Sequence, residues 1–332
     1  MSKLKKRLFK TLGILLVVSA LFAFSPTVTV FAEEPYPSRP VRLIVPFPPG
    51  GGVDVVARLA AADLYKHLGQ QTIVENRGGG GSIIGTEYVA KSKPDGYTLL
   101  VVSGVFTTAP ALRKLPYDPI KSFTPVVRIG VGPNTLVVNP NFPAKTVKEL
   151  LAMCKEKPGK LIFGSSGAGG NPHMSIELFK LMAGVDFKII HYKGGGPSLI
   201  ELMGGHIHAV IGSLAQAMGY IKSGKLRCLG NGTAERSLML PDVPTIAEAG
   251  VPGYEAGNWW AIMAPAGTPA PVVQRLTQAY KTVLSDGEVQ KRLLNSGAEP
   301  NFMDASKLGP FIERELARWD EVVKKANIKL EQ

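Results

Sequence analysis

The chain has 332 residues, 45% of them hydrophobic and 19% charged, so it is long enough for two domains and is not of a disordered class. Its formal net charge is +12, but no basic run is interleaved with aromatic residues, so the composition excludes a nucleic-acid-binding protein. The 37 glycines and 26 prolines predict short, sharply turned connections.

The first 32 residues have the pattern of a signal peptide. A basic start precedes an apolar stretch over 12–24, and Val30-Phe-Ala32 offers small residues where a signal peptidase cuts. Cleavage after Ala32 removes five basic residues and lowers the net charge from +12 to +7. The stretch is shorter than the ~20 residues of a bilayer span. We therefore predict a periplasmic or extracytoplasmic protein, with an uncleaved membrane anchor as the alternative.

Strand-like and helix-like runs alternate along the rest of the chain, which predicts an α/β fold with mainly parallel sheets flanked by helices. The predicted strands are apolar runs at 41–45, 72–74, 97–102, 135–138, 161–163, 188–191, 209–211, 226–229 and 260–264. Amphipathic helices are predicted after Asp54, after a capping box at Thr146-Val-Lys-Glu149 and after the glycines at 167–170.

The C-terminal part predicts three helices in succession. One begins at Pro269 and runs to about residue 284, and another covers 288–296 with Gly297 in the C′ position. The last covers 306–326 and has an apolar face, which we expect to pack back on the first part of the fold.

These elements predict two lobes. The first comprises 33–132 and 254–332, and the second comprises 133–253. The crossovers near 130–140 and 250–258 contain glycine and proline, and we expect the hinges there.

The cysteine and histidine patterns give little indication of a disulfide or a metal site. Cys154 and Cys228 either pair after export or stay as buried free thiols. His206 and His208 would share one face of a strand, but zinc needs at least a third ligand. The sequence predicts no metal and no cofactor.

Three glycine-rich loops each lie between a strand-like and a helix-like run. They are Pro46-Phe-Pro-Pro-Gly-Gly-Gly-Val-Asp54, Gly164-Ser-Ser-Gly-Ala-Gly-Gly-Asn-Pro-His173 and Tyr192-Lys-Gly-Gly-Gly-Pro197. Glycines let backbone amides approach a ligand, and a helix N-terminus favours negative charge. Together they predict a site that captures an anion with main-chain donors.

The same loops fit enzyme motifs poorly. Gly167-Ala-Gly169 begins a dinucleotide fingerprint, but Pro172 occupies the third glycine position. Residues 219–225 begin a phosphate-binding loop, but a leucine follows where magnesium needs a hydroxyl. Gly164-Ser-Ser166-Gly-Ala168 is similar to a nucleophile elbow, so a serine hydrolase using Ser166 is an alternative that still lacks a defined acid–histidine pair.

Several side chains in these loops have two interpretations. Asp54 is predicted as a helix N-cap that fixes its loop. Ser165 and Ser166 add hydroxyl donors, or else belong to a tight turn without a ligand. Lys193 attracts an anion or is simply solvated. Aromatic residues beside the loops and hinges either wall a pocket or belong to the core: Phe47, Trp259 and Trp260.

Further motifs extend along the whole chain after residue 32. They are Tyr36-Pro-Ser-Arg-Pro-Val-Arg42, Val74-Glu-Asn-Arg-Gly-Gly79, Lys93-Pro-Asp-Gly-Tyr-Thr-Leu-Leu100, Leu115-Pro-Tyr-Asp-Pro119, Leu240-Pro-Asp-Val-Pro-Thr-Ile-Ala-Glu-Ala-Gly250 and Ala264-Pro-Ala-Gly-Thr-Pro269. With the glycine loops, in this order, they resemble the Bug-type periplasmic substrate-binding proteins of tripartite tricarboxylate transporters.

The resemblance implies a two-lobed periplasmic-binding-protein fold that closes by a hinge over its ligand, and no catalysis. One ligand carboxylate would be held by loops 47–54 and 165–173, and the other end would meet 104–108, 193–195 and 211–214. The ligand-binding residues implied in this way are Phe47, Pro48, Gly50, Gly51, Gly52, Asp54, Thr107, Ser165, Ser166, Gly167, Gly169, Gly170, His173, Lys193, Gly194 and Ser213.

The resemblance also implies the partners. These are a small organic carboxylate, either a di- or tricarboxylate or an aromatic one, and the membrane subunits of the transporter. Departures from the family pattern at Val53, Thr108-Ala-Pro110 and Gly212-Ser213 leave the ligand open. We expect a monomer, and a carboxylate sensor for a signalling partner is the alternative.

Overall fold

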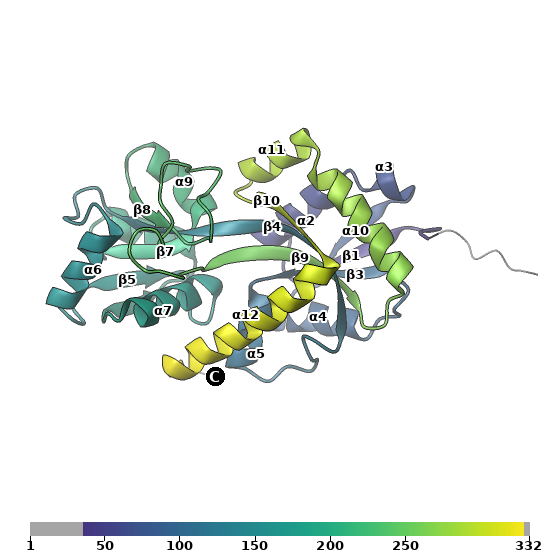
Figure 1. The fold of residues 1–332 in the computed structure, drawn as a ribbon, viewed down its shortest axis with the longest axis horizontal. Helices are drawn as coiled ribbons and strands as arrows, with labels where there is room; N and C mark the ends of the chain where they lie inside the picture. Colours follow the sequence, from purple (N-terminus) through teal and green to yellow (C-terminus); the bar gives the residue numbers. More distant parts are fainter. Residues whose placement is uncertain (1–35, 329–332) are drawn as a thin grey trace, which may run out of the picture. The chain divides into compact units, whose positions relative to one another are not determined.

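The computed structural model describes residues 36–328, and the predicted signal peptide lies outside them. The first half of this range contains β1 (Val41–Val45), α2 (Gly52–Ala61), α3 (Tyr65–Leu68), β2 (Thr72–Asn76), a 3₁₀ turn (Gly80–Ser82), α4 (Ile83–Ala90), β3 (Thr98–Ser103), α5 (Val105–Leu112), β4 (Phe123–Val138), α6 (Val147–Glu156) and β5 (Ile162–Ser165). The second half contains α7 (Asn171–Ala183), β6 (Lys188–His191), α8 (Gly195–Met203), β7 (Ala209–Ser213), α9 (Leu214–Lys222), β8 (Arg227–Asn231), β9 (Gly257–Pro265), α10 (Ala270–Leu284), α11 (Gly287–Asn295), β10 (Glu299–Asp304) and α12 (Ala305–Lys325) (Figure 1). No helix in the described part is long and apolar enough to cross a membrane.

The strands form two joined sheets. Sheet A has the order β2-β1-β3-β9-β4 with β10 paired to β4, and sheet B has the order β4-β7-β5-β6 with β8 paired to β4. The outer strands are parallel, as in β1 with β2 and β5 with β6. The pairs made by β4 and β9 are antiparallel, so each sheet is mixed. The predicted α/β class is confirmed, whereas the expectation of mainly parallel sheets is wrong, because the pairs made by β4 and β9 are antiparallel.

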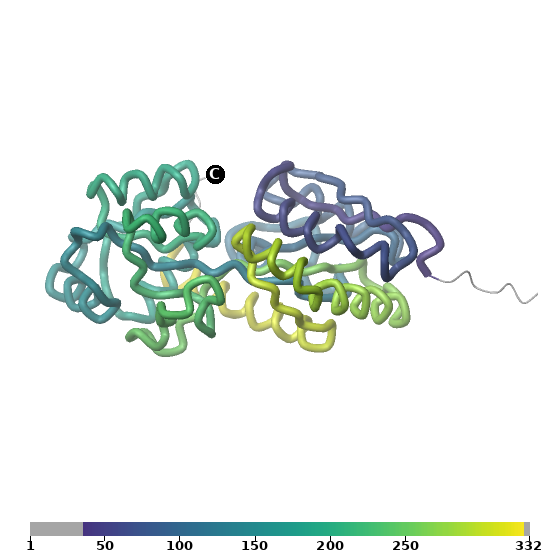
Figure 2. Tube along the Cα trace, turned by 90° about the horizontal axis from the view of Figure 1, so that it is seen from above, coloured from purple at the N-terminus to yellow at the C-terminus, as the bar shows by residue number. Residues whose placement is uncertain are grey.

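Strand β4 belongs to both sheets and joins them (Figure 2). The sequence predicts only 135–138, which is the end of the strand that pairs in sheet B. The first part was missed because Pro125, Gly130 and Gly132 interrupt the apolar pattern. The glycines are needed there: a Cβ on Gly132 would lie 2.6 Å from the ring of Trp260. Proline is accommodated because the pairing shifts register between Pro125 and Val127.

Helices cover both faces of each sheet. One face of sheet A packs against α2, α10 and α11, and the other against α4, α5 and the start of α12. Sheet B packs against α6 and α7 on one face, and against α8 and α9 on the other. Trp259 and Trp260 point to opposite faces of sheet A and are buried in its two clusters, as alternation along β9 requires. Both tryptophans are therefore core residues.

The last helix packs on sheet A, in agreement with the prediction that it packs back on the first part of the fold, and it also joins the sheet B cluster. Leu308 and Ile312 belong to a cluster of sheet A, and Trp319 and Val322 belong to the cluster of sheet B that includes α7. The helix runs from β10 across α5 towards α7 (Figure 1). Its apolar face continues as far as Val322, and the tertiary arrangement places the second half of that face against the sheet B cluster. The predicted lobe boundaries stay a prediction.

Local signals at helix ends are confirmed. The Thr146 hydroxyl accepts from the Glu149 amide at 3.2 Å, and the Glu149 carboxylate accepts from the Lys145 amide at 2.6 Å. Gly297 has φ +81° just after α11, and the next amide bonds back to the Leu293 carbonyl at 3.0 Å.

Both cysteines are free thiols, which settles the alternative that the sequence left open. Burial raises the pKa of Cys154 to about 11 and that of Cys228 to about 12. Neither thiol is therefore a reactive thiolate at neutral pH.

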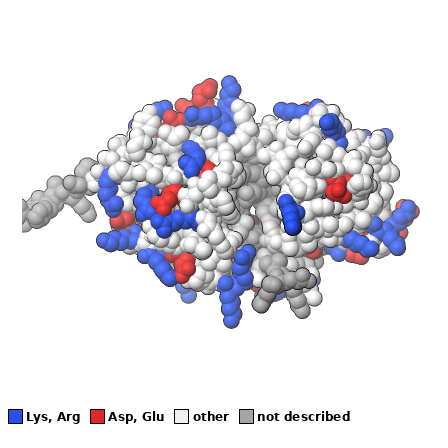
Figure 3. Space-filling model, turned by 180° about the vertical axis from the view of Figure 1, so that it is seen from behind, with Lys and Arg blue, Asp and Glu red and all other residues white. Residues whose placement is uncertain are grey.

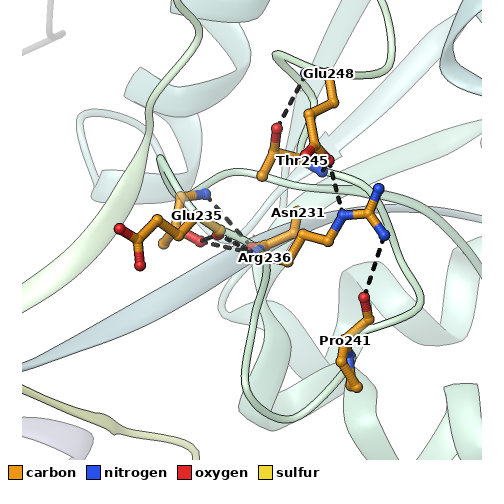
Figure 4. Close-up of polar contacts among 7 residues, drawn as sticks. Asn231, Glu235, Arg236, Pro241, Thr245 and Glu248 are labelled. Carbon is orange, nitrogen blue, oxygen red and sulfur yellow. Dashed lines mark hydrogen bonds and ion pairs between the residues drawn. The ribbon is translucent and has the colours of Figure 1, made fainter.

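The segment 232–256 leads from sheet B back to β9, and its own polar side chains hold it together (Figure 4). Arg236 donates to the Glu248 carboxylate at 3.0 Å, and Thr245 and Glu248 cap each other as in a capping box. One residue later than Arg236, the buried Ser237 hydroxyl donates to the carboxylate of Glu299 on β10. This segment thus contacts sheet A as well as sheet B.

Candidate functional site

The two main glycine loops each follow the carboxyl end of a parallel strand. Loop 46–51 leaves β1 and enters α2, and loop 166–170 leaves β5 and enters α7. In open α/β sheets, ligands bind outside the carboxyl ends of strands. The chain therefore places both loops where a ligand site is expected, one on sheet A and one on sheet B.

Asp54 holds the first loop from inside the helix. It is the third residue of α2, while Gly51 occupies the N-cap position, so the prediction of Asp54 as N-cap is wrong. Its carboxylate is 3% exposed and accepts hydrogen bonds from the Gly50 amide at 2.9 Å and from Arg58 at 3.0 Å. The predicted effect of this residue, fixing the loop, is what these bonds do.

Asn76, at the end of β2, completes this arrangement. Its side-chain amide donates to Asp54 at 2.9 Å and to the Phe47 carbonyl at 3.1 Å. Burial by itself would raise the pKa of Asp54, but the hydrogen bonds from Arg58, Gly50 and Asn76 outweigh it and lower that pKa. Sequence reasoning did not assign Asn76 a role, although it lies in the motif that begins at Val74.

The bonds around Asp54 determine which donors the first loop can offer. The Gly50 amide is already bonded to Asp54, so it is not free for a ligand in this conformation. The amides of Gly51, Gly52 and Val53 are at the helix start, where helix geometry provides no acceptor. Pro48, Gly51 and Gly52 are exposed, and Phe47 is half-buried against the sheet A cluster.

The second loop is held by Ser165 and His173. Ser165 is fully buried, and its hydroxyl donates to the Gly167 carbonyl at 3.1 Å and accepts from the Gly167 amide at 3.3 Å. His173 Nδ1 accepts from the Gly169 amide at 2.9 Å. Gly167 and Gly169 both have positive φ, +145° and +71°, so glycine is required at these two turns.

The amides of Gly167 and Gly169 donate to these two side chains and are therefore not free for a ligand. The donors that remain at the start of α7 are the amides of the N-cap Gly170, of Asn171 and of His173, because Pro172 has no N–H. The two loops thus offer similar groups: helix-start amides on rigid, glycine-rich turns.

The Nδ1 of His173 acts as an acceptor in this arrangement, because the Gly169 amide donates to it. Its Nε2 lies 3.5 Å from the Glu177 carboxylate, and its ring centroid lies 4.4 Å from that of His191. Burial, and secondly the neighbouring His173, lower the pKa of His191. Loop 165–173 contains no lysine or arginine, so its donors are mainly backbone amides and hydroxyls.

The third glycine loop supports the second. The Tyr192 amide donates to the Ser165 carbonyl at 2.8 Å, and the Gly194 amide donates to the Ser166 carbonyl at 3.1 Å. Gly194 therefore holds the second loop with its own N–H. Lys193 is exposed, so its charge is free to attract an anion.

A pocket in sheet B brings together three of these segments. Its lining includes Ser166, Gly195, Ser213 and Gln216, with Leu199 on its apolar side. A Cβ on Gly195 would lie 1.9 Å from the Gln216 side-chain oxygen, so a larger residue there would displace the Gln216 amide. Gln216 was missed because it lies two residues beyond the predicted segment 211–214.

Thr107 does not face a pocket in this conformation. It is fully buried on α5, and its hydroxyl donates to the Gly104 carbonyl at 3.1 Å. Gly104 lies close to the side chain of Asn171, the first residue of α7, which connects several elements described below.

The arrangement contains no hydrolase or metal centre. Among residues 36–328, no hydrogen bond joins the Ser166 hydroxyl to a histidine, and His173 uses its Nδ1 for Gly169. His206 is exposed beside Glu201, while His208 Nδ1 accepts from the Ile162 amide at 2.9 Å. Within the same residues, no group of three or more potential metal ligands gathers.

Comparison with known proteins identifies the family. Residues 56–328 match the model of the tripartite tricarboxylate transporter family receptor, TctC, and the chain belongs to this family. The family consists of substrate-binding receptors, so the protein is a binding protein and not an enzyme. The resemblance stated from the sequence is confirmed.

Individual relatives extend over nearly the whole chain. BugT of Bordetella pertussis is 37% identical over 320 residues, which are 96% of this chain and 98% of that protein. An R. palustris protein solved with adipate is 39% identical with a TM-score of 0.73, covering 89% of this chain and 99% of the other. MatC from Rhodopseudomonas palustris with bound malate is 34% identical with a TM-score of 0.69, covering 87% and 100%.

Proposed function

We propose that this protein is an extracytoplasmic receptor that binds a small organic carboxylate, a di- or tricarboxylate or an aromatic carboxylate, between loops 47–54 and 165–173. The observation that carries the proposal is that both loops present helix-start amides from turns already locked by their own side chains. Amides without an intrahelical acceptor, at the positive end of a helix, favour a carboxylate.

The charges around these loops support an anionic ligand. The one carboxylate within them, Asp54, is paired with Arg58 and bonded to Asn76, so its negative charge is compensated locally. The neighbouring Lys193 is exposed and adds positive charge. On the face opposite that of Figure 1, a furrow between the two halves is bordered mainly by uncharged residues (Figure 3). The neutral amides of the two loops can hold a carboxylate without the desolvation cost of a buried arginine.

The relatives support the ligand class. Two solved structures with 39% and 34% identity were obtained with adipate and with malate, which are both dicarboxylates. Residue departures such as Val53 and Gly212-Ser213 leave open whether this chain takes the same acids. The dicarboxylates are therefore the first class to test.

The family also supports the location and the partner that we propose. A transporter receptor operates outside the cytoplasm, and the first 32 residues have the pattern of a signal peptide. We propose that the protein acts as a monomer and delivers its ligand to the membrane subunits of a tripartite tricarboxylate transporter.

The substitution Gly52→Pro tests the proposal. Gly52 is the first residue of α2, the residue before it has extended backbone (φ −73°, ψ 162°), and a Cβ there meets nothing within 4 Å. Proline is well tolerated at this helix position and removes one amide donor. Losing one charge-assisted hydrogen bond of ~1.5–3 kcal/mol should weaken binding by roughly 10- to 100-fold. Calorimetric titration with malate, adipate, citrate and benzoate, after refolding to remove carried-over ligand, measures the effect.

The matched control is Gly287→Pro. Gly287 is likewise the first residue of a helix, α11, with open space around it and an extended residue before it. It should fold and bind as the unmodified protein does. If Gly52→Pro binds as tightly as this control, the α2 amides do not hold the ligand. If the unmodified protein binds none of the four acids, the proposed carboxylate class is wrong.

A further inference from the structure

The side chain of Asn171 ties the second glycine loop to β4, the strand that joins the sheets, and to β9 of sheet A. Asn171 is the first residue of α7 and is 8% exposed. Its Oδ1 accepts from the Asn134 side-chain amide at 2.7 Å, and its Nδ2 donates to the Gly257 carbonyl at 3.0 Å. Asn134 lies on β4 and Gly257 begins β9, so one side chain reaches both strands.

The side-chain NH₂ group of Asn134 donates to two residues of α7. Asn134 is 2% exposed, and its Nδ2 also donates to the Ser175 hydroxyl at 2.9 Å, one turn further along α7. Its backbone carbonyl accepts from the Gly232 amide at 2.7 Å. A buried amide that loses its partner is left unsatisfied, at a cost of ~1–3 kcal/mol. A small shift of β4 relative to α7 is therefore penalised.

Asn171 also meets α5, on the sheet A side. Gly104 precedes α5, and its amide donates to the side chain of Asn258 on β9 at 2.9 Å. A Cβ on Gly104 would lie 3.0 Å from Asn171 Nδ2 and 3.1 Å from Asn258 Oδ1. Glycine is thus the residue that lets α5 approach both asparagines. Four elements, α5, α7, β4 and β9, meet at this asparagine cluster of Asn134, Asn171 and Asn258.

We propose that Asn171 is a positioning residue that couples loop 165–173 to β4 and β9, so that ligand on the loop and movement of these strands affect each other. This inference rests on the proposed function only in that the loop is the carboxylate site. The coupling itself is a property of the ligand-free protein. Buried, hydrogen-bonded amides suit this role because they change partners in discrete steps, whereas apolar contacts can slide.

Two substitutions perturb the cluster from opposite sides. Asn171→Ala removes its bonds to Asn134 and Gly257. Gly104→Ala adds a Cβ against Asn171 and Asn258 from α5, in a backbone conformation that alanine adopts readily (φ −49°, ψ −26°). The control is Gly219→Ala on α9, where a Cβ meets nothing within 4 Å.

Hydrogen exchange of the purified ligand-free protein measures the coupling. We expect Asn171→Ala to accelerate exchange at least fivefold in segments 131–135 and 256–259. We expect Gly104→Ala to accelerate exchange to the same extent in segment 165–170, which is distant from Gly104 in the sequence. Both variants should also bind carboxylate about tenfold more weakly, equivalent to 1.4 kcal/mol. Gly219→Ala should change neither quantity.

The outcomes separate this inference from the proposed function. Changes confined to the neighbours of each substituted residue in the chain would overturn the coupling, whether or not carboxylates bind. Coupled exchange in a protein that binds no carboxylate would leave the coupling in place and overturn the proposed function. If Asn171→Ala does not fold, the milder Gly104→Ala decides the question alone, since exchange in 165–170 either rises or does not.

Discussion

Replacing Asp54 by asparagine should destabilise the protein by removing a bond that a carboxylate alone can make. The carboxylate accepts from the Gly50 amide on one oxygen, and from Arg58 and Asn76 on the other. An asparagine that keeps the second oxygen turns its NH₂ towards the Gly50 amide, so two donors face each other. Losing this bond costs about 1–3 kcal/mol at a buried site. The charge on Arg58 adds little, because that side chain is 50% exposed.

Urea unfolding at pH 7 measures the effect of Asp54→Asn. Asp320→Asn is the matched control, because Asp320 pairs with Lys324 on the exposed side of α12 and should change stability by less than about 0.5 kcal/mol. The folded-state pKa of Asp54 is lowered, so its contribution is present above the unfolded pKa of ~3.9 and is lost as pH falls through the folded pKa. The difference between the two proteins should therefore shrink towards pH 3. Equal stability of both variants at pH 7 would refute the reasoning.

Three further predictions concern the core and the titrating groups. Trp319→Ala should cost about 3–5 kcal/mol in thermal or urea unfolding, because the buried indole fills the sheet B cluster. Burial lowers the pKa of His208, whose Nδ1 accepts from the Ile162 amide. The stability that neutral His208 contributes is therefore present above pH ~6.5 and is lost as pH falls through its folded pKa. Between pH 7.5 and 5, the melting temperature of His208→Asn should decrease less than that of the unmodified protein. Cys154 is buried and should react with a thiol reagent at pH 7.5 only after denaturation, and reaction of native Cys154 would contradict its burial; the half-buried Cys228 should react slowly, because its pKa is raised to about 12.

Local signals in the sequence predicted the elements that flank the loops. Short apolar runs that end at glycine or proline gave the positions of β1, β5 and β6 to within two residues at each end. The capping box at Thr146 marked the start of α6. These signals depend on neighbouring residues alone, which is why one sequence suffices to detect them.

The missed elements depend on contacts between distant residues. The first part of β4 contains glycines because Trp260 and the Glu299 carbonyl approach the strand there. Strand β10, Glu299–Asp304, contains a proline and a register shift, and its pattern does not alternate. Which sheet the end of α12 meets likewise follows from the tertiary arrangement and not from its apolar face.

Candidate site residues show the same division. The glycine loops were found from composition, but the way each loop is locked was not. The side-chain amides of Asn76 and Asn171 bond to residues that are far away in the chain, Asp54 and Gly257. The spacing of these asparagines in the sequence gives no sign of such contacts. The register of β2 on β1 places Asn76 beside Val45, and only then does its amide reach Asp54.

The two loops are each held by a side chain that accepts a hydrogen bond from a loop amide, but the acceptors differ chemically. In the first, the Gly50 amide donates to the carboxylate of Asp54, and in the second, the Gly169 amide donates to the imidazole of His173. Each acceptor lies four residues after the amide, inside the helix that the loop enters. Each lock orients a turn and leaves the amides at the helix start without an intrahelical acceptor. Asp54 is paired with Arg58 and His173 holds its loop as a hydrogen-bond acceptor, so the helix-start amides are the donors that an anion at either loop would meet.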